Sequence, residues 1–390
     1  MRMNIIPELK SRHAEHTAWR HTIHAHPELA YEEHKTSDLV AERLESFGIK
    51  IERGLGKTGV VGSIKYGDSK KRIGLRADMD ALPLQEKNEF THRSQTDGVM
   101  HACGHDGHTT MLLAAAEYLA ANECFDGTID LIFQPAEEGE AGARAMIEDG
   151  LFEKYPVDAV YGLHNWPGLD VGKLAVRKGP MMAAMDIFEV TVKGKGGHGA
   201  LPHLATDPIL IASQLVQAWQ GIVSRNINPV DAAVVSVTQI HAGDAYAVIP
   251  NEVVLRGTVR SFKPEVRDLL EARMQQIASG ICAAHNASFD WRYDRRFPAT
   301  VNSSQETDNT IRVASELLGS ENVNPDVEPV TGSEDFAYML QEKPGCYAFI
   351  GNGPGAGGCL LHSPHYDFND DAIPVGASYW VNLAQQELPL

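Results

Sequence analysis

The chain has 390 residues, a formal net charge of −18 and a hydrophobic content of 43%. This length accommodates two domains with substantial cores. The negative charge argues against nucleic acids and anionic membrane surfaces as partners, because both repel an acidic protein.

Neither end of the chain nor its interior predicts a membrane segment. The N-terminus lacks the apolar stretch of a signal peptide, and no apolar run reaches the roughly 18 residues that a membrane span requires. Five cysteines, an odd number without a CxxC pair, do not form the pattern of a disulfide framework. We therefore expect a cytoplasmic protein, in a reducing compartment that would preserve a catalytic thiolate.

The first part of the chain, to residue 178, alternates helix-like and strand-like segments. The predicted helices are residues 9–25, 37–47, 109–121 and 142–149, and the predicted strands are residues 59–66, 72–77, 128–134 and 159–163. Alternation of this kind predicts an α/β fold with a mixed, largely parallel sheet sandwiched by helices.

The order of predicted strands and helices changes near residue 185. The predicted elements are a strand at 186–193, a helix that opens at Pro208, strands at 233–240 and 252–262, a helix at 264–284 and a strand at 288–293. This β-α-β-β-α-β order is the ferredoxin-like pattern. We therefore expect residues 184–294 to be an inserted α+β domain within a catalytic domain made of residues 1–183 and 295–390.

Two adjacent carboxylates, Glu137 and Glu138, follow the predicted strand that ends at residue 134. Side chains of neighbouring extended residues point to opposite sides, so one glutamate can hold a metal while the other faces a bound water. The alternative is a solvated acidic loop, which is the usual setting of charged residues.

The segment 100–108 contains three histidines and a cysteine directly before a predicted helix. Cys103 and His105 are good ligands for a borderline-soft cation, and Asp106 can support one of the histidines. A helix N-terminus also favours a thiolate. The alternative is a structural role, in which these side chains cap the helix or fill a core.

Two more histidines occupy similar settings. His164 follows the apolar run 159–163, and His362 follows the glycine-rich loop 351–358. Each alone is more often a core or surface residue than a ligand. Asp78 and Asp80 come after a strand-like segment, and polar residues at strand ends are expected at the top of an open α/β sheet.

Several motifs along the chain are specific when taken together. They are residues 20–29, 75–83, 100–106, 133–138, 194–200, 202–203, 332–336 and 362–370. In these segments the chain resembles the M20 metallopeptidases from end to end. Within them it is most similar to the amidohydrolases of subfamily D, which include hippurate hydrolases, auxin–amino acid conjugate hydrolases and related N-acyl amino acid hydrolases.

The resemblance implies a site for two divalent metal ions, Zn²⁺ or Mn²⁺, which Co²⁺ or Ni²⁺ can replace. The implied ligands are Cys103, His105, Glu138, His164 and His362, with the Cys103 thiolate bridging. Glu137 would be the general base and acid. Asp78 and Asp80 are expected to be supporting groups, and His101, His108, His203 and His365 are expected to be structural or supporting groups.

The resemblance also implies a homodimer or a dimer-based oligomer, with the inserted domain as lid and dimerisation domain. His198 of a neighbouring subunit would help to polarise the substrate carbonyl. Many relatives have an asparagine where this chain has Ala247, so the contacts with the substrate are expected to differ here. Arg260 either holds a substrate carboxylate or forms a surface salt bridge.

The implied function is metal-dependent hydrolysis of the amide bond of N-acyl amino acids, such as hippurate-like or indoleacetyl conjugates. One alternative is deacetylation of N-acetyl amino acids, such as N-acetyl-diaminopimelate or N-acetylcysteine. Another is a non-catalytic descendant that binds conjugates, which the loss of asparagine at Ala247 favours. Nucleophilic catalysis by Cys103 is disfavoured, because a metal-bound thiolate is a weak nucleophile and the paired glutamates would then have no role.

Overall fold

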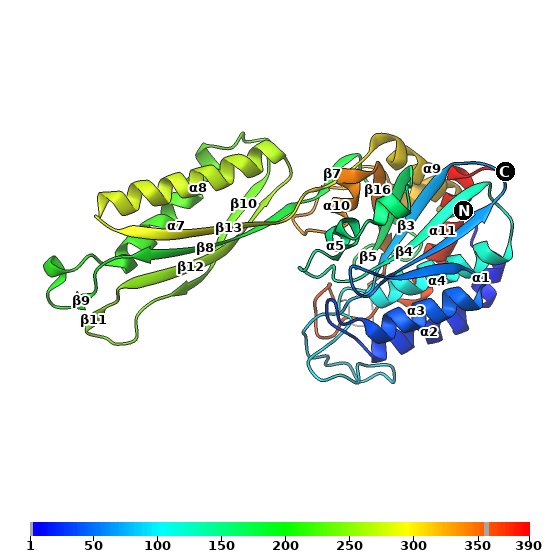
Figure 1. Cartoon of the computed structure of the whole chain (residues 1–390), viewed down its shortest axis with the longest axis horizontal. Helices are drawn as coiled ribbons and strands as arrows, with labels where there is room; N and C mark the ends of the chain where they lie inside the picture. Colours follow the sequence, from blue (N-terminus) through cyan, green and yellow to red (C-terminus); the bar gives the residue numbers. More distant parts are fainter. Residues whose placement is uncertain (1–2, 355–358) are drawn as a thin grey trace. The chain divides into compact units, whose positions relative to one another are not determined.

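The computed structural model describes residues 3–354 and 359–390 and divides into two compact units (Figure 1). The first unit contains the residues up to Met181, Val301–Glu328 and Asp335–Leu390. The second unit contains Met182–Thr300 and Pro329–Glu334. Residues 355–358 of the predicted glycine-rich loop lie outside the described residues.

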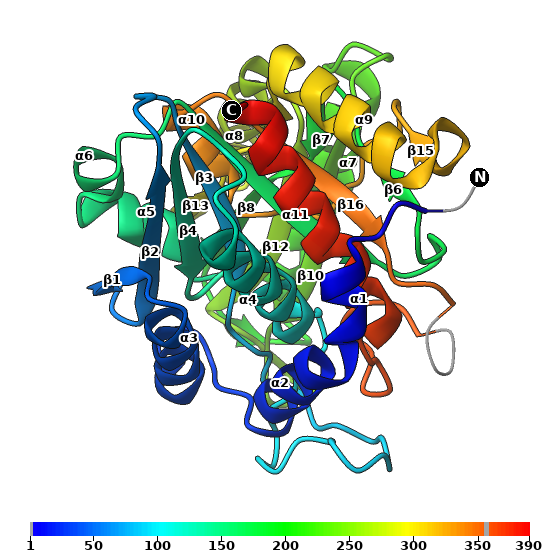
Figure 2. The same cartoon turned by 90° about the vertical axis from the view of Figure 1, so that its right-hand side faces the viewer.

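The first unit is built on a mixed eight-stranded sheet (Figure 2). In spatial order its strands are β1 (Lys50–Leu55), β2 (Gly59–Tyr66), β4 (Gly127–Gln134), β3 (Arg72–Asp78), β5 (Ala159–Trp166), β16 (Gly345–Gly351), β6 (Leu174–Ala175) and β15 (Val323–Asn324). The central strands β4, β3, β5 and β16 run parallel, whereas β1 and β2 form an antiparallel edge. The prediction of a largely parallel sheet is confirmed.

Helices cover both faces of this sheet. Helices α4 (His105–Ala121) and α11 (Ile373–Glu387) pack together on one side, whereas α5 (Gly142–Glu148) and α10 (Ala337–Glu342) lie on the other side (Figure 1). Because both faces are covered, every residue of β16 is buried. Among the described residues, none of the helices combines the length and apolar composition that a membrane-spanning segment requires.

The N-terminal helices differ from the prediction of a single helix at residues 9–25. The structure has a short helix α1 (Pro7–Ser11) and a longer helix α2 (His13–Ala25), which are separated at Arg12. Proline at the first position of a helix loses no hydrogen bond, because the N–H of that position has no partner within the helix. The chain therefore begins helical structure before residue 9 and interrupts it once.

Helix α3 (His34–Ser46) begins three residues before the predicted start at residue 37. The carboxylate of Glu28 accepts hydrogen bonds from the backbone N–H groups of Lys35 (3.1 Å) and Thr36 (3.0 Å). These N–H groups lie in the first turn, where they have no partner within the helix. A side chain from outside the helix thus supports its start, a contact that local sequence patterns do not contain.

Strands β1 and β16 are absent from the sequence predictions. β1 carries charged residues on an exposed edge of the sheet, so it lacks the apolar pattern of a buried strand. β16 begins and ends with glycine, which has a low strand propensity. Between these glycines, Tyr347, Phe349 and Ile350 favour a strand, and β16 pairs with β5 along its full length.

The second unit has a four-stranded antiparallel sheet and two long helices. In spatial order the strands are β10 (Ala233–His241), β12 (Glu252–Ser261), β8 (Ala184–Lys193) and β13 (Ser288–Phe297), and the helices are α7 (Pro208–Arg225) and α8 (Pro264–Ala284). The apolar faces of these elements form a core of their own. The chain order β8-α7-β10-β12-α8-β13 confirms the predicted ferredoxin-like pattern. Its role as lid and dimerisation domain stays a prediction.

Candidate metal centre

The carboxyl ends of three parallel strands carry predicted site residues of the first unit. β3 ends at Asp78, and β4 ends three residues before Glu137. His164 lies near the end of β5, and His105 is the first residue of α4. Because open α/β sheets bind ligands at this edge, residues far apart in sequence meet here.

The structure brings all five predicted ligands together. Their side-chain atoms form two groups of three, Cys103–His105–His164 and Cys103–Glu138–His362, and within each group they lie no more than 4.8 Å apart. The Sγ atom of Cys103 is 3.4 Å from Nε2 of His164, and Oε1 of Glu138 is 3.4 Å from Nε2 of His362. The thiol of Cys103 is therefore shared by both groups, as a bridging ligand must be. We call these five residues the ligand cluster.

Two of the histidines are held in the tautomer that metal binding requires. Nδ1 of His105 lies 2.9 Å from the carbonyl oxygen of Asp80, and Nδ1 of His164 lies 2.7 Å from the carbonyl oxygen of Asn165. A carbonyl oxygen only accepts hydrogen bonds, so each Nδ1 carries the hydrogen. In the neutral ring, each Nε2 therefore carries the lone pair that a metal ion binds.

The buried donor atoms of the ligand cluster are of the kinds that bind a divalent cation. Among the described residues, Nε2 of His105 and Oε1 of Glu138 are buried without a hydrogen-bond partner. Burial and the charges of Glu138 and Glu137 raise the pKa of the Cys103 thiol well above its ordinary value. Unpartnered buried acceptors are costly, and a divalent cation satisfies them while it favours the thiolate. The sulfur, nitrogen and oxygen ligands thus fit a divalent metal.

The turn after β4 fixes the two glutamates. The carboxylate of Asp80 accepts hydrogen bonds from the backbone N–H groups of Glu137 (3.0 Å) and Glu138 (2.9 Å). Ala136 adopts a left-handed conformation with φ of 55°, and its N–H group donates to Glu33 (2.8 Å). Strain at a non-glycine residue persists where surrounding contacts enforce it, often at functional sites.

Asp78 and His108 form a third group with His105, but their atoms are engaged elsewhere. Nδ1–H of His108 donates to Oδ1 of Asp78 (2.6 Å), and Nε2 of His108 accepts from the backbone N–H of Asn165 (2.9 Å). Arg76 donates to the other oxygen of Asp78 at 2.8 Å. Both nitrogens of His108 are thus occupied, and this geometry makes Asp78 and His108 supports of the neighbouring ligands.

Glu137 lies beside the ligand cluster without belonging to either group that shares Cys103. Its side-chain oxygen is within 4.8 Å of the ligand atoms of His105 and Glu138. The residue is only 6% exposed. This position, next to the predicted metal ligands and shielded from solvent, is suited to proton transfer.

His362 differs from the other ligands in conformation and exposure. It adopts a left-handed backbone conformation with φ of 64°, and its N–H group donates to the carbonyl oxygen of Ala102 at 2.8 Å. Its side chain is 54% exposed, whereas Cys103, His105 and His164 are buried. One group of three is therefore open to solvent on the side of His362.

Three residues with predicted roles belong to the second unit. His198 lies exposed on β9 (Gly197–His198), and Ala247 directly precedes β11 (Val248–Ile249), the strand that pairs with β9. Arg260 donates to Thr258 and to the carbonyl oxygen of Val259 (3.2 Å) and has no carboxylate partner among the described residues. The ligand cluster of the first unit forms without these residues.

Two supporting residues had no predicted role. Nδ2 of Asn165 donates to the carbonyl oxygen of Cys103 (2.6 Å), and the hydroxyl of Tyr366 donates to Oδ1 of Asn165 (2.6 Å). Both side chains are fully buried. Their positions in the sequence could have indicated these roles, because Asn165 directly follows His164 and Tyr366 lies in the motif that begins at His362.

A shared thiol, three imidazoles and a carboxylate beside a further buried glutamate define a metal-dependent hydrolase. Such a site needs ligands for the metal and a separate group that transfers protons. The fold and the site thus point to the same class of enzyme.

Comparison with known proteins identifies the family. Residues 74–386 match the model of peptidase family M20/M25/M40. The chain is 45% identical over 386 residues to the hippurate hydrolase of Campylobacter jejuni, which covers 99% of this chain and 100% of that protein. It is 42% identical over 370 residues to the N-acetyl-L-cysteine deacetylase of Bacillus subtilis, which covers 95% of this chain and 87% of that protein.

A solved structure agrees with this match. A dinuclear metal-binding peptidase of the M20 family from Bacillus subtilis has a TM-score of 0.84 at 34% identity, covering 96% of this chain and 98% of that one. The chain belongs to peptidase family M20 and is a metal-dependent amidohydrolase. The family predicted from the motifs is confirmed.

Proposed function

We propose that the enzyme hydrolyses N-acyl amino acids of the hippurate-like or indoleacetyl type, releasing a carboxylic acid and a free amino acid. The observation that carries this proposal is the pair of ligand groups around the Sγ atom of Cys103, with the carboxylate of Glu137 beside them. The similarity to a hippurate hydrolase along nearly the whole chain supports the choice of substrate.

The ligand cluster would hold two divalent cations, one in each group of three, with Cys103 between them. Thiolate and imidazole ligands suit Zn²⁺, and Mn²⁺, Co²⁺ or Ni²⁺ are the alternatives. Bound cations of this kind polarise the substrate carbonyl and lower the pKa of a bound water.

Glu137 would act as the general base and acid of the reaction. Its carboxylate accepts a proton from the attacking water and returns it to the nitrogen that leaves with the amino acid. Burial beside His105 and Glu138 keeps this carboxylate close to the ligand cluster. Asp80 holds the backbone of both glutamates and thereby fixes the direction of each side chain.

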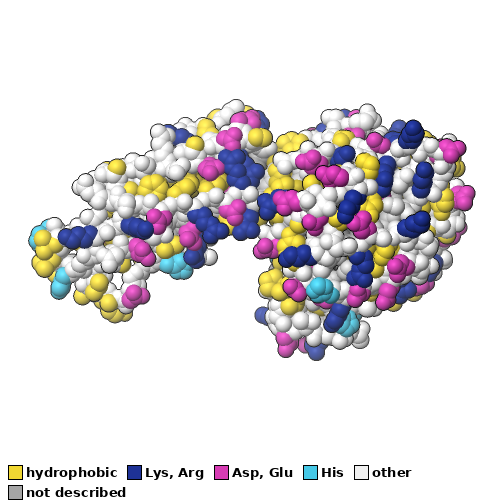
Figure 3. Space-filling model, in the orientation of Figure 1, with side chains coloured by type: hydrophobic (Ala, Val, Ile, Leu, Met, Phe, Trp, Pro, Cys, Tyr) yellow, Lys and Arg dark blue, Asp and Glu magenta, His cyan; other side chains and the backbone are white. Residues whose placement is uncertain are grey.

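We also propose a homodimer in which His198 of one subunit acts at the site of the other. Leu204, Tyr246 and Val248 are exposed near β9 and β11 in the second unit, and Figure 3 shows hydrophobic side chains at the end of this unit that carries those strands. Exposed apolar side chains in one area favour association with another surface. A second copy that covers this area would place His198 within an interface.

A cytoplasmic location is part of the same proposal. Cys103, Cys124, Cys282 and Cys346 are free thiols, and Cys103 must stay reduced to bind metal. A reducing compartment meets this requirement.

A panel of benzoyl-, indoleacetyl- and acetyl-amino acids tests the function. Metal-free protein is reloaded with Zn²⁺ or Mn²⁺, and kcat/KM is measured for each conjugate by release of the free amino acid. We expect turnover of benzoylglycine and indoleacetyl conjugates above that of acetyl conjugates. Absence of hydrolysis with every metal and conjugate would contradict the proposal and favour a non-catalytic binding protein.

Deacetylation of N-acetyl amino acids is the second candidate. The 42% identity to an N-acetyl-L-cysteine deacetylase favours it. Higher kcat/KM for acetyl conjugates in the same panel would establish this candidate and leave the metal chemistry unchanged.

A further inference from the structure

Arg20, on helix α2, is a fully buried arginine that contacts three carboxylates. Its Nη1 atom lies 3.0 Å from Oδ2 of Asp106 and 2.9 Å from Oδ1 of Asp367, and its Nε atom lies 2.5 Å from Oδ1 of Asp370. The side chain of Arg20 is 0% exposed. One guanidinium thus contacts three carboxylates that come from two segments of the chain.

These carboxylates belong to the segments that carry the ligand cluster. Asp106 directly follows His105 in the first turn of α4. Asp367 and Asp370 follow His362 in the segment that leads into α11. Arg20 therefore joins the segment of Cys103 and His105 to the segment of His362, the two sides of the cluster.

The contact between the two segments depends on the positive charge of Arg20. Burial lowers the pKa of Arg20, but the charges of Asp106, Asp367 and Asp370 outweigh burial and raise it, so the side chain stays protonated. Without the guanidinium the carboxylates repel one another across a buried space. A lysine would keep the charge but cannot reproduce donors that point in several fixed directions.

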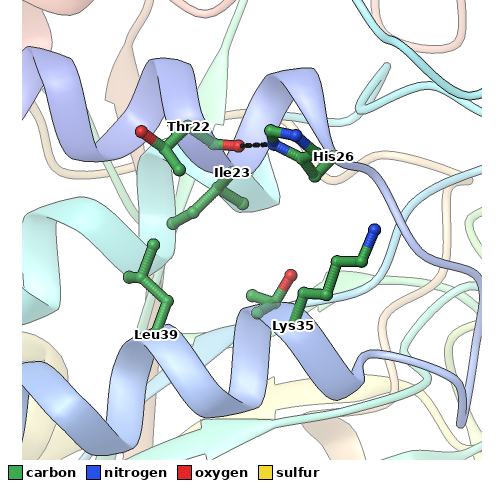
Figure 4. Close-up of a pocket in the computed structure, with 6 residues that line it drawn as sticks. Thr22, Ile23, His26, Lys35 and Leu39 are labelled. Atoms are coloured by element: carbon green, nitrogen blue, oxygen red, sulfur yellow. Dashed lines mark hydrogen bonds between the residues drawn. The ribbon is translucent and has the colours of Figure 1, made fainter.

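Helix α2 packs against α4, which carries His105 and Asp106. On its other side α2 borders a groove of about 280 Å³, which Thr22 and Ile23 line together with Lys35 and Leu39 of α3 (Figure 4). On the side of α4, Nδ1 of His24 bonds Oδ2 of Asp106 at 2.9 Å. The same carboxylate thus receives both Arg20 and His24.

We propose that Arg20 is a positioning residue that holds the Cys103–His105 side and the His362 side of the ligand cluster at the separation that two cations require. This inference rests on the proposed metal site. It assigns a role to a buried residue on a helix that carries no ligand. Other contacts, such as the bond from the His362 N–H group to Ala102, connect the same segments, and Arg20 adds the charge that lets three carboxylates lie together.

Metal titration of the full-length protein tests this role. Metal-free wild type, Arg20→Gln, Arg20→Lys and Asp370→Asn are titrated with Co²⁺, and the thiolate-to-cobalt absorbance and the number of bound ions are followed. Asp370 is partly exposed, so its substitution keeps the test available if Arg20→Gln does not fold. Far-ultraviolet circular dichroism verifies the fold of each variant.

Arg72→Gln is the matched control. Arg72 forms an ion pair with the buried Asp130 at 2.5 Å, but it is the first residue of β3, at the end of the strand opposite Asp78. Its loss therefore removes a comparable ion pair away from the ligand cluster. A purely structural effect would appear in both arginine variants as a lower Tm with unchanged metal affinity.

We expect Arg20→Gln to weaken the binding of at least one Co²⁺ by about tenfold or more, with Arg20→Lys intermediate and Arg72→Gln like wild type. Asp370→Asn should weaken binding of the ion near His362. Folded Arg20→Gln and Asp370→Asn proteins that bind two ions with wild-type affinity would overturn the inference and leave the proposed function intact. A wild type that binds no Co²⁺ through Cys103 would instead overturn the metal site itself.

Discussion

At the scale of single residues, Glu137 and Glu138 are neighbours with different surroundings. Glu138 belongs to the group with Cys103 and His362, whereas Glu137 lies beside that group. Both backbone N–H groups bond the same carboxylate, that of Asp80. A single carboxylate therefore holds both residues, of which we propose Glu138 for metal binding and Glu137 for proton transfer.

The substitution Glu137→Gln tests this division. It keeps the size of the side chain and its backbone contacts but removes the group that accepts a proton. We expect metal content to stay near that of wild type while kcat falls by about 10²–10⁴-fold, the usual contribution of acid–base catalysis. Elemental analysis and steady-state kinetics provide the two measurements.

Cys103→Ser is the contrasting variant. A serine hydroxyl is a poor substitute for a thiolate ligand, so this variant should lose metal as well as activity. Retention of near-native kcat by Glu137→Gln would remove Glu137 from the mechanism. Full metal content in Cys103→Ser would remove Cys103 from the ligand cluster.

At the scale of elements, the N-terminus of α4 is positioned by close packing. Gly104, directly before the helix, has φ of 95°, a conformation that other residues rarely adopt. Gly107 lies against the ring of Phe368, because a Cβ atom at this position would be 2.3 Å from that ring. Two glycines thus allow His105 to sit between β3 and the segment that follows His362.

Gly107→Ala and Gly280→Ala form a matched pair of helical substitutions. The methyl group at Gly107 overlaps the buried Phe368, so we expect a loss of about 1–3 kcal/mol in the free energy of unfolding. Gly280, on α8, has no atom within 4 Å of an added Cβ, so alanine should stabilise the protein by up to about 1 kcal/mol. Urea denaturation of both variants measures these changes, and stabilisation by Gly107→Ala would show that the contact with Phe368 is loose.

The sequences of individual helices and strands explain which of them could be predicted. Strands such as β4 and β5 have mainly apolar runs and were predicted, whereas β16, whose apolar run 346–350 lies between two glycines, was missed. The prediction of one helix at residues 9–25 was wrong in its continuity, because Arg12 ends α1 and directly precedes α2. Local patterns indicate which segments form helices or strands, whereas breaks and pairing partners depend on contacts distant in sequence.

At the scale of the whole molecule, the buried pair of His24 and Asp106 makes stability depend on pH. Burial lowers the pKa of His24, but the charge of Asp106 and hydrogen bonds to Asp106 and Glu86 outweigh it and raise the pKa to about 9. The ordinary value is 6.5, so the folded state binds the proton more tightly than the unfolded state. The stabilisation is complete below pH 6.5 and is lost as the pH rises toward 9.

We therefore expect the free energy of unfolding to fall by about 3 kcal/mol from this pair between roughly pH 6.5 and 9. Urea denaturation across this range, at saturating metal, measures the change. The variant His24→Gln should show a smaller dependence on pH, because it has no proton to lose. Equal pH dependence in wild type and His24→Gln would contradict this assignment.

The site is assembled from residues far apart in the chain, so its sequence predicts only part of the site. Cys103 with His105, and Glu137 with Glu138, form local motifs whose chemistry is visible from residue types. His164 and His362 stand alone in the sequence, and only the resemblance to a family assigned them to the same site. Arg20 escaped prediction because its partner Asp106 and the aspartates near His362 are distant in sequence, so nothing in its own neighbourhood reveals the contact.

The side chains of the ligand cluster differ in exposure, and this difference affects how fast metal ions exchange. His362 is half open to water, while His105 and His164 are enclosed. Ions leave and enter a site faster where a ligand can swing into solvent. In the proposed two-metal site, the ion beside His362 would therefore exchange with the surrounding medium faster than the ion beside His164.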